Sequence, residues 1–379
     1  MIEWELRDVE AAFKEADHVI EDTYYSPKVQ QTISQGLAEI DKTIERCRTE
    51  ALGGHVYQCP DCGEVQYRYH SCRNRHCPKC QNDKAHMWLE KQQDLLLPTR
   101  YFLVTFTLPD ELRRLARSHQ KLFYSLLFRT SASATQKLAQ DPRFIGGQVG
   151  MVGVLHTWGR NLTFHPHIHY LVPAGGLALD RQTWLPARKG FFLPVKALSR
   201  IFRAKFRDAL RKTDCFDTIP ADVWAKDWVV HCQPVGTGLG ALKYLAPYIF
   251  RVAISNNRIL RLANGRVTFR FRATDTGKLT TATLPALEFI RRFLQHVLPR
   301  GFVKVRYYGF LAHGCRKRLA ALHHQLDHLF SVSSPVLSSG DTATSSDTIS
   351  PNYVPLCPSC GQLCGAVRPF AHSTSYLED

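Results

Sequence analysis

The sequence lacks the features of membrane-spanning, exported and nucleotide-hydrolysing proteins. No uninterrupted apolar run approaches the roughly 20 residues that a membrane helix needs, and the opening from Met1 to Asp8 has no apolar stretch of a signal peptide. A Walker A loop is missing, because Gly277-Lys278 has Arg272 where the first glycine belongs and Leu279 where Ser or Thr belongs. We therefore expect a soluble, intracellular protein that leaves any unwinding of nucleic acid to other proteins.

Acidic residues are also scarce. The 379 residues include 49 Lys and Arg but 33 Asp and Glu, a net charge of +16. The basic residues concentrate in 188–212, 251–272 and 291–318, where aromatic residues interleave them. Cations bind phosphates and rings stack on bases, so this pattern favours a single-stranded nucleic acid as partner; the alternative is a basic surface that serves solubility alone. Candidate nucleic-acid contacts are Arg203, Lys205, Arg207, Arg251 and Arg258.

The 12 cysteines are better explained as metal ligands than as disulfides, because a reducing compartment keeps thiols reduced. Two Cys-x-x-Cys knuckles, Cys59 to Cys62 and Cys77 to Cys80, are separated by 14 residues, which is typical of a four-cysteine zinc site. Cys72, His76 and His55 are alternate ligands, and a second ion or a redox role stays open. A third pair, Cys357-x-x-Cys360 with Cys364, resembles half a zinc ribbon, which either pairs with Cys315 or is a remnant.

A row of histidines lies in the stretch from Phe164 to Pro173. The pattern predicts that this stretch is a strand, and that the preceding strand is Met151 to Trp158. Alternate strand residues share a face, so His165, His167 and His169 point the same way, with neighbours about 6 to 7 Å apart. Such histidines can converge on a metal ion, although any of them can also simply pack or hydrogen-bond. His156 on the preceding strand lies near the same face. Pro166 predicts that the strand is at a sheet edge or bulged there.

The order of expected elements is β-α-β-β-α-β-α. The segments are 101–107, 110–140, 151–158, 162–172, 194–212, 227–232 and 238–251, and a hairpin over 258–272 follows, turning at Asn264-Gly265. This order predicts an α+β, ferredoxin-like (split βαβ) sheet in which the two histidine-region strands are central neighbours. We divide the chain into a helical segment 1–50, a zinc-binding domain 51–96, a catalytic domain 97–310, a basic helix with a Ser/Thr-rich linker 311–350, and a Cys-x-x-Cys tail 351–379.

The helix at 238–251 carries Tyr244 and Tyr248, which share a face because they are four residues apart. A phenol that faces a metal-polarised phosphodiester is a competent nucleophile. Two such tyrosines are also common as core or surface residues. Pro247 between them predicts a kink, which could leave Tyr244 as the only nucleophile.

Several of these motifs together resemble the rolling-circle transposases of the insertion sequence 91 family, two-tyrosine enzymes of the HUH class. The resemblance runs from Ile44 to about Phe310. It rests on the stretches 45–49 (ERCRT), 52–55 (LGGH), 71–81 (SCRNRHCPKCQ), 106–109 (FTLP), 155–159 (LHTWG), 165–169 (HPHIH), 190–195 (GFFLPV), 243–245 (KYL) and 251–256 (RVAISN).

The resemblance implies an HUH endonuclease that nicks single-stranded DNA, attaches to its 5′ phosphate and joins it to a new 3′ hydroxyl. His167 and His169 would bind Mg²⁺ or Mn²⁺, Tyr244 and Tyr248 would be the nucleophiles, and the cysteine knuckles would bind Zn²⁺. His165, His156 and Gln233 are candidates for a third ligand. The implied setting is the bacterial cytoplasm at the nucleoid, with host helicase and replication proteins as partners. The alternatives are a replication initiator or relaxase with the same chemistry, and a zinc-dependent DNA-binding regulator without catalysis.

Overall fold

A computed structural model describes residues 46–73, 77–250, 253–254, 258–273, 276–331 and 356–370. These residues divide into two compact units: a larger unit of residues 88–331, and a smaller unit that combines residues 46–87 with 356–370. Most of the expected N-terminal helix, the alternate ligand His76, the candidate DNA contact Arg251 and the Ser/Thr-rich part of the linker lie outside the described residues. Within the described part of the chain, no helix has the length and apolar character to cross a membrane.

A five-stranded antiparallel sheet organises the larger unit. Its order is β12-β4-β5-β3-β8, where β3 is Tyr101–Thr107, β4 is Met151–Trp158, β5 is Phe164–Pro173, β8 is Val230–Pro234 and β12 is Val305–Tyr308. β3 is buried almost throughout, because both faces of the sheet are covered. This explains why its sequence, YFLVTFT, is a continuous run of β-formers and not an alternating one. The predicted mixture of helices and strands is confirmed.

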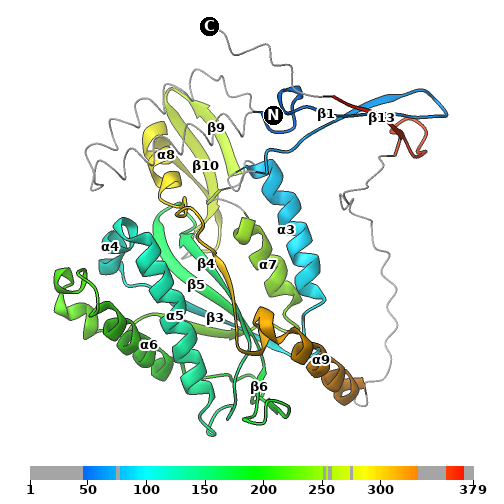
Figure 1. Cartoon of the computed structure of the whole chain (residues 1–379). Helices are drawn as coiled ribbons and strands as arrows, with labels where there is room; N and C mark the ends of the chain where they lie inside the picture. The colour runs from blue at the N-terminus through cyan, green and yellow to red at the C-terminus, as the bar shows by residue number, and fades with distance from the viewer. Residues whose placement is uncertain are drawn as a thin grey trace. The chain divides into compact units, whose positions relative to one another are not determined.

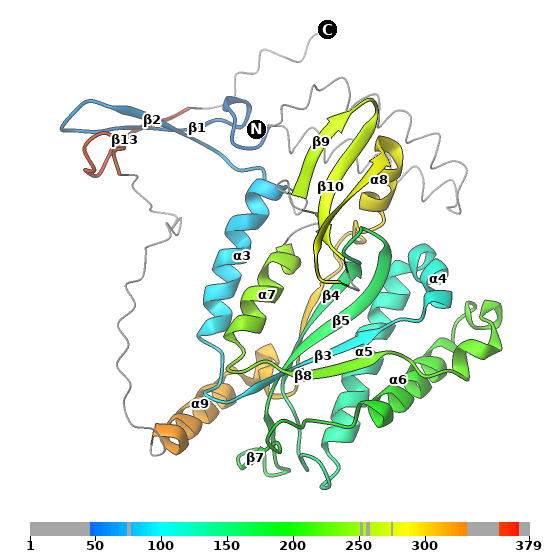
Figure 2. The same cartoon turned by 180° about the vertical axis from the view of Figure 1, so that it is seen from behind.

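Helices pack on both faces of this sheet. On one face lie α5 (Gln120–Ala139) and α6 (Val195–Leu210) (Figure 1). Phe202 of α6 meets Phe106 of β3, with ring centroids 5.1 Å apart. On the other face lies α7 (Leu239–Phe250) (Figure 2). Its buried leucines pack on Leu103 and Leu171. Odd-numbered residues of β3 and β5 therefore face α7, and the histidine row is on that side.

Pro166 lies at an irregular point of β5. The ladder pairs His156 with His167 but Trp158 with Phe164, so the register shifts opposite Pro166. Of the two predicted arrangements, the structure has the bulge: β5 is an interior strand between β4 and β3. A bulge accommodates a residue that has no N–H to donate to the ladder.

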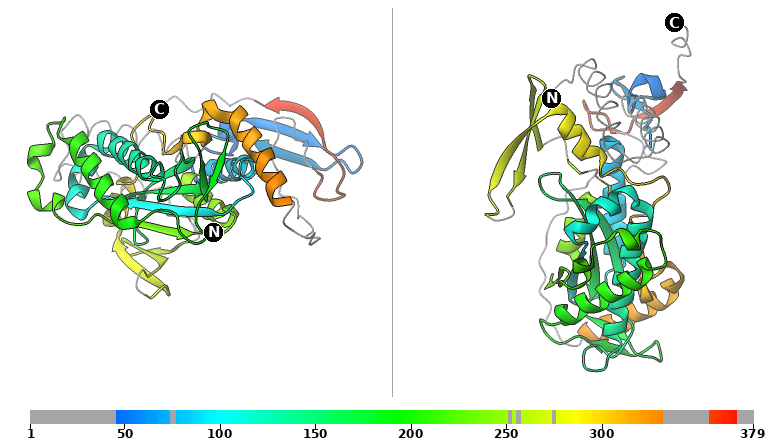
Figure 3. Two further views of the ribbon diagram at one scale, coloured as in Figure 1. Left: turned by 90° about the horizontal axis from the view of Figure 1, so that it is seen from below. Right: turned by 90° about the vertical axis from the view of Figure 1, so that its left-hand side faces the viewer.

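A second sheet, with the order β11-β10-β9, adjoins the turn between β4 and β5 (Figure 3). It consists of β9 (Ile259–Ala263), β10 (Arg266–Arg272) and β11 (Leu279–Pro285), and α8 (Ala286–Leu294) packs on it. Asn264 and Gly265 have φ of 52° and 65°, as a tight hairpin turn requires, so the predicted hairpin is confirmed. Leu162 of the β4–β5 turn is buried in the same apolar cluster as Phe269.

Shorter elements complete the two units. The helices are α3 (Pro78–Gln93), α4 (Arg113–Ser118) and α9 (Arg316–Ser331); the strands β6 (Gly175–Leu177) and β7 (Trp184–Pro186) form a small ribbon; and the 3-10 turns are Glu50–Leu52, Asp110–Leu112, Phe216–Thr218, Ala221–Trp224, Gly309–Leu311 and His313–Cys315.

In the smaller unit, β1 (Gly54–Gln58) pairs with β2 (Val65–Tyr69) and, on its other side, with β13 (Gly365–Phe370). Residues from the two ends of the chain thus share one sheet.

Candidate active site

Three histidines form one cluster on the α7 face of the large sheet. His156 of β4 pairs with His167 of β5, and His169 lies two residues further along the same face. Their ring centroids are 4.6 to 5.3 Å apart, and one possible ligand atom from each lies within 4.8 Å of the others. Side chains at this spacing can converge on a single divalent ion.

Hydrogen bonds orient two of these rings. His167 Nδ1 is 2.6 Å from the carbonyl oxygen of His165, and because a carbonyl only accepts, Nδ1 must carry the proton. Nε2 of His167 is then the atom with a free lone pair for a metal. His169 Nδ1 lies 2.8 Å from Thr105 Oγ1 of β3, which leaves Nε2 of His169 for the same ion. Such outer contacts fix ring orientation in metal sites.

Burial keeps the three imidazoles neutral. It lowers the pKa of His156 and His167 well below the usual value, and the neighbouring His169 adds to the effect on both. Burial also lowers the pKa of His169 to about 4. At pH 7 each ring therefore keeps a lone pair, which metal binding requires.

Of the three candidates for the third ligand, the structure places His156 in the cluster. His165 shares the face, but its Nδ1 is bonded to the guanidinium of Arg113, a cation that would oppose a nearby metal ion. Burial, followed by this guanidinium, lowers the pKa of His165. Gln233 pairs with Leu103, one row away from Thr105 and His169. Sequence spacing could not rank the three, because strand pairing decides which side chain comes close.

Tyr244 of α7 lies beside the cluster. Its ring is 6.3 Å from that of His169, nearly edge-on at 84°, and the side chain is 48% exposed. The neighbouring residues Leu242 and Leu245 are buried against the sheet, so they hold α7 in this position. The helix continues through Pro247 to Phe250, while the side chains of Pro247 and Tyr248 lie outside the part that is described.

Three of the predicted DNA contacts that the structure describes lie away from the cluster. Arg203, Lys205 and Arg207 lie on α6, which packs on the opposite face of the sheet. Arg203 donates to the carbonyl oxygens of Ala225 and Lys226. Arg258 donates to the carbonyl oxygens of Arg270 and Arg160, and so ties β10 to the β4–β5 turn. Both Arg203 and Arg258 thus make hydrogen bonds within the protein.

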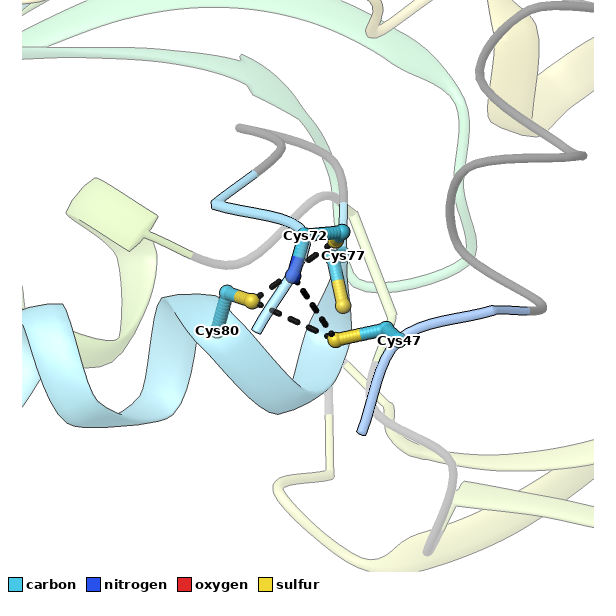
Figure 4. A group of neighbouring side chains, drawn as sticks. All are labelled: Cys47, Cys72, Cys77 and Cys80. Atoms are coloured by element: carbon cyan, nitrogen blue, oxygen red, sulfur yellow. Dashed lines mark hydrogen bonds between the residues drawn. The ribbon is translucent and has the colours of Figure 1, made fainter. Parts of the chain in front are cut away.

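Eight cysteines of the smaller unit form two groups of four. The first is Cys47, Cys72, Cys77 and Cys80, with sulfur atoms of Cys47 and Cys72 at 3.5 and 3.7 Å from that of Cys80 (Figure 4). The second is Cys59, Cys62, Cys357 and Cys360. The expected sharing of one site by the knuckles Cys59–Cys62 and Cys77–Cys80 is therefore wrong: each knuckle belongs to a different group.

The reason for this error is that a Cys-x-x-Cys spacing brings two thiols together but does not select the partner pair. No such motif includes Cys47, so spacing alone does not mark it as a ligand, and Cys72 is a full member of the same group. The tail pair Cys357 and Cys360 meets Cys59 and Cys62, not Cys315, which lies in the larger unit.

Comparisons with known proteins match two parts of the chain. Residues 18–108 match the family described as "Transposase zinc-binding domain", and residues 150–318 match the family described as "Putative transposase". A relative from Sinorhizobium fredii, named "Putative transposase y4qJ", is 42% identical over 312 residues, which cover 76% of this chain and 78% of the relative. The "Transposase for insertion sequence element IS801" of Pseudomonas savastanoi pv. phaseolicola is 30% identical over 303 residues, 73% of this chain and 72% of the relative. No solved structure matches.

Proposed function

Because the chain belongs to the insertion sequence 91 family of transposases, we propose that it nicks and rejoins single-stranded DNA through a covalent 5′-phosphotyrosine, in rolling-circle transposition. The observation that carries the proposal is the position of Tyr244 beside His169 in the three-histidine cluster. A phenol and a set of metal-ligating nitrogens on one face are the two parts that such chemistry needs.

The topology supports an HUH endonuclease fold. Helix α5 connects β3 to β4, and β5 lies between these two strands in the sheet. Helix α6 connects β5 to β8, and β3 lies between those two strands. This is the split βαβ arrangement of ferredoxin-like sheets, with β12 added beside β4. It puts both central strands of the sheet, β3 and β5, under α7, where the histidines and Tyr244 meet.

In the proposed site, His156, His167 and His169 would hold Mg²⁺ or Mn²⁺. Three neutral imidazole nitrogens can act as ligands of a divalent ion. When bound, the ion supplies polarisation of the scissile phosphate.

Tyr244 provides the nucleophile. Its phenol oxygen attacks phosphorus, the bond from phosphorus to the 3′ oxygen breaks, and that oxygen leaves as a 3′ hydroxyl with a proton. In the reverse step a new 3′ hydroxyl attacks the phosphotyrosine, and the phenol is released. The bond energy is conserved, so joining needs no nucleotide. Tyr248, one helical turn along α7, is the proposed second nucleophile. Host helicases would supply single strands, and the enzyme would work in the bacterial cytoplasm, at the nucleoid.

The test is a covalent adduct. Purified protein is incubated with 5′- and 3′-labelled single-stranded oligonucleotides from the flanks of its own gene, with and without Mn²⁺ or Mg²⁺, and run on a denaturing gel. We expect a metal-dependent protein adduct on the 5′ end of the downstream fragment. Binding that is independent of metal, with no adduct on any flank, would instead support a regulator that does not cut DNA.

Thr105 should act as a positioning residue for His169. Thr105→Val keeps the size of the side chain but removes the hydroxyl 2.8 Å from His169 Nδ1. Loss of such an outer contact typically weakens metal binding about 10- to 100-fold. We expect this loss in a Mn²⁺ titration, with activity recovered at high Mn²⁺. Thr163→Val, on an exposed threonine of the β4–β5 turn, is the control. An unchanged Mn²⁺ affinity for Thr105→Val would contradict the role.

A further inference from the structure

We propose that Cys59, Cys62, Cys357 and Cys360 form a second zinc site, which closes the smaller unit with residues from near both ends of the chain. The last two ligands lie outside both matched ranges, residues 18–108 and 150–318. The family assignments therefore say nothing of this part of the chain.

The four sulfur atoms are close enough together to bind one ion, since all lie within 4.8 Å of one another. Sγ of Cys59 is 3.4 Å from Sγ of Cys360, and Sγ of Cys62 is 3.4 Å from Sγ of Cys357. Four thiolates at about 2.3 Å from a zinc ion have sulfur atoms about 3.8 Å apart. A disulfide needs about 2.05 Å, and these cysteines are free thiols.

The two halves of the site have the same local structure. The sequences are Cys59-Pro-Asp-Cys62-Gly-Glu and Cys357-Pro-Ser-Cys360-Gly-Gln. In the first, the N–H of Cys59 donates to the carbonyl oxygen of Glu64 (2.9 Å) and that of Gly63 to the carbonyl oxygen of Cys59 (3.0 Å). In the second, Cys357 donates to Gln362 (2.7 Å) and Gly361 to Cys357 (2.9 Å).

The glycines and the backbone amides of the two turns are also equivalent. Gly63 and Gly361 have φ of 76° and 78°, a conformation that favours glycine, so each closes its turn directly after the second cysteine. The backbone of Cys62 hydrogen-bonds to the Cys59 sulfur, and the backbone of Cys360 to the Cys357 sulfur. Amide donors aimed at thiols stabilise the thiolate form that zinc binds. Two matched turns presenting four thiolates to one point are a zinc ribbon.

The surrounding strands hold the halves together. The first turn joins β1 to β2, the second leads into β13, and β13 pairs with β1 from Gly54↔Phe370 to Gln58↔Gly365. Gln66 Nε2 of β2 donates to the carbonyl oxygen of Leu356, at 2.9 Å. A sheet of three short strands has little core of its own, so a metal ion is the expected source of its stability.

A fifth cysteine, Cys364, has to be distinguished from the four proposed zinc ligands. Cys364 is buried beside the group, but it lies outside the four thiols that share one point, and Gln66 Nε2 donates to its sulfur at 3.6 Å. We assign Cys364 to packing and Cys360, which is exposed, to the metal.

The test is a zinc count on the full chain, purified under reducing conditions. It is made with His167→Ala present, so that zinc in the histidine cluster does not add to the total. We expect two zinc ions per chain, one for each cysteine group. Cys357→Ser with Cys360→Ser should reduce the count to one, as should Cys47→Ser with Cys80→Ser. The matched controls Cys315→Ser and Cys364→Ser should keep both ions. Replacing zinc by Co²⁺ gives a second readout, because the sulfur-to-cobalt absorption should fall by half in each double variant.

Two further measurements guard against misfolding and oxidation. Cys360→His should keep the second ion, since imidazole is also a zinc ligand. Unchanged zinc in the Cys357/Cys360 double variant would overturn the proposal. Loss of zinc in Cys364→Ser but not in Cys360→Ser would also overturn it. A mass spectrum of fresh, non-reduced protein that shows a Cys59–Cys360 or Cys62–Cys357 disulfide would do the same.

Discussion

Replacing Tyr244 by Phe is expected to abolish the covalent adduct and to reduce strand cleavage by at least about 10³-fold, the scale seen when an enzyme loses its nucleophile. The variant keeps the ring 6.3 Å from that of His169 and removes only the phenol oxygen. Folding should be unaffected, because the side chain is 48% exposed and the packing of α7 depends on the buried Leu242 and Leu245. The effect should therefore be on chemistry alone.

Two variants make this prediction specific. Tyr67→Phe removes the hydroxyl of another exposed tyrosine, in the smaller unit, and should leave cleavage unchanged. Tyr248→Phe separates the two proposed nucleophiles: we expect it to keep the cleavage adduct and to lose joining to a second strand. If Tyr244→Phe still formed the adduct and Tyr248→Phe did not, the two roles would be exchanged. An adduct in the double variant would exclude both tyrosines.

His156 should be the third metal ligand, and its loss should be nearly as severe. We expect His156→Gln to weaken Mn²⁺ binding and cleavage at least about 100-fold, more than the loss of an outer contact causes. His165→Gln should change either quantity less than about 10-fold, since His165 is bonded to Arg113 and is not among the three converging rings. Mn²⁺ binding followed by electron paramagnetic resonance and the oligonucleotide assay would measure both.

The comparison between the two histidines contains its own control. Both lie at the same end of the sheet, His156 on β4 and His165 on β5, and both variants carry the same new side chain. Thermal unfolding without metal shows whether His156→Gln, at a position only 3% exposed, has merely disturbed the fold. A larger loss for His165→Gln than for His156→Gln would mean that the ligand set is His165, His167 and His169.

Local sequence patterns predicted the individual strands and turns of this protein, and which side chains share a strand face. The alternation in Phe164–Pro173 put His165, His167 and His169 on one face, and Asn264-Gly265 predicted the hairpin turn, because both features depend on neighbours in the chain. The order of elements predicted strands that the structure pairs as β8-β3-β5-β4. The resemblance of several motifs to the insertion sequence 91 family predicted a transposase with a zinc-binding domain, and the family is confirmed.

Contacts between distant segments were decided only by the tertiary structure. His156 enters the cluster because β4 pairs with β5 in one register, and Arg113 engages His165 because α4 lies near the start of β5. The cysteines make the same point: Cys59 and Cys62 share a group with Cys357 and Cys360, across most of the chain, while Cys77 and Cys80 join Cys47 and Cys72. A short motif determines which side chains share a turn or a face. Which faces and turns then meet depends on strand pairing and packing over the whole chain, which spacing along the sequence does not encode.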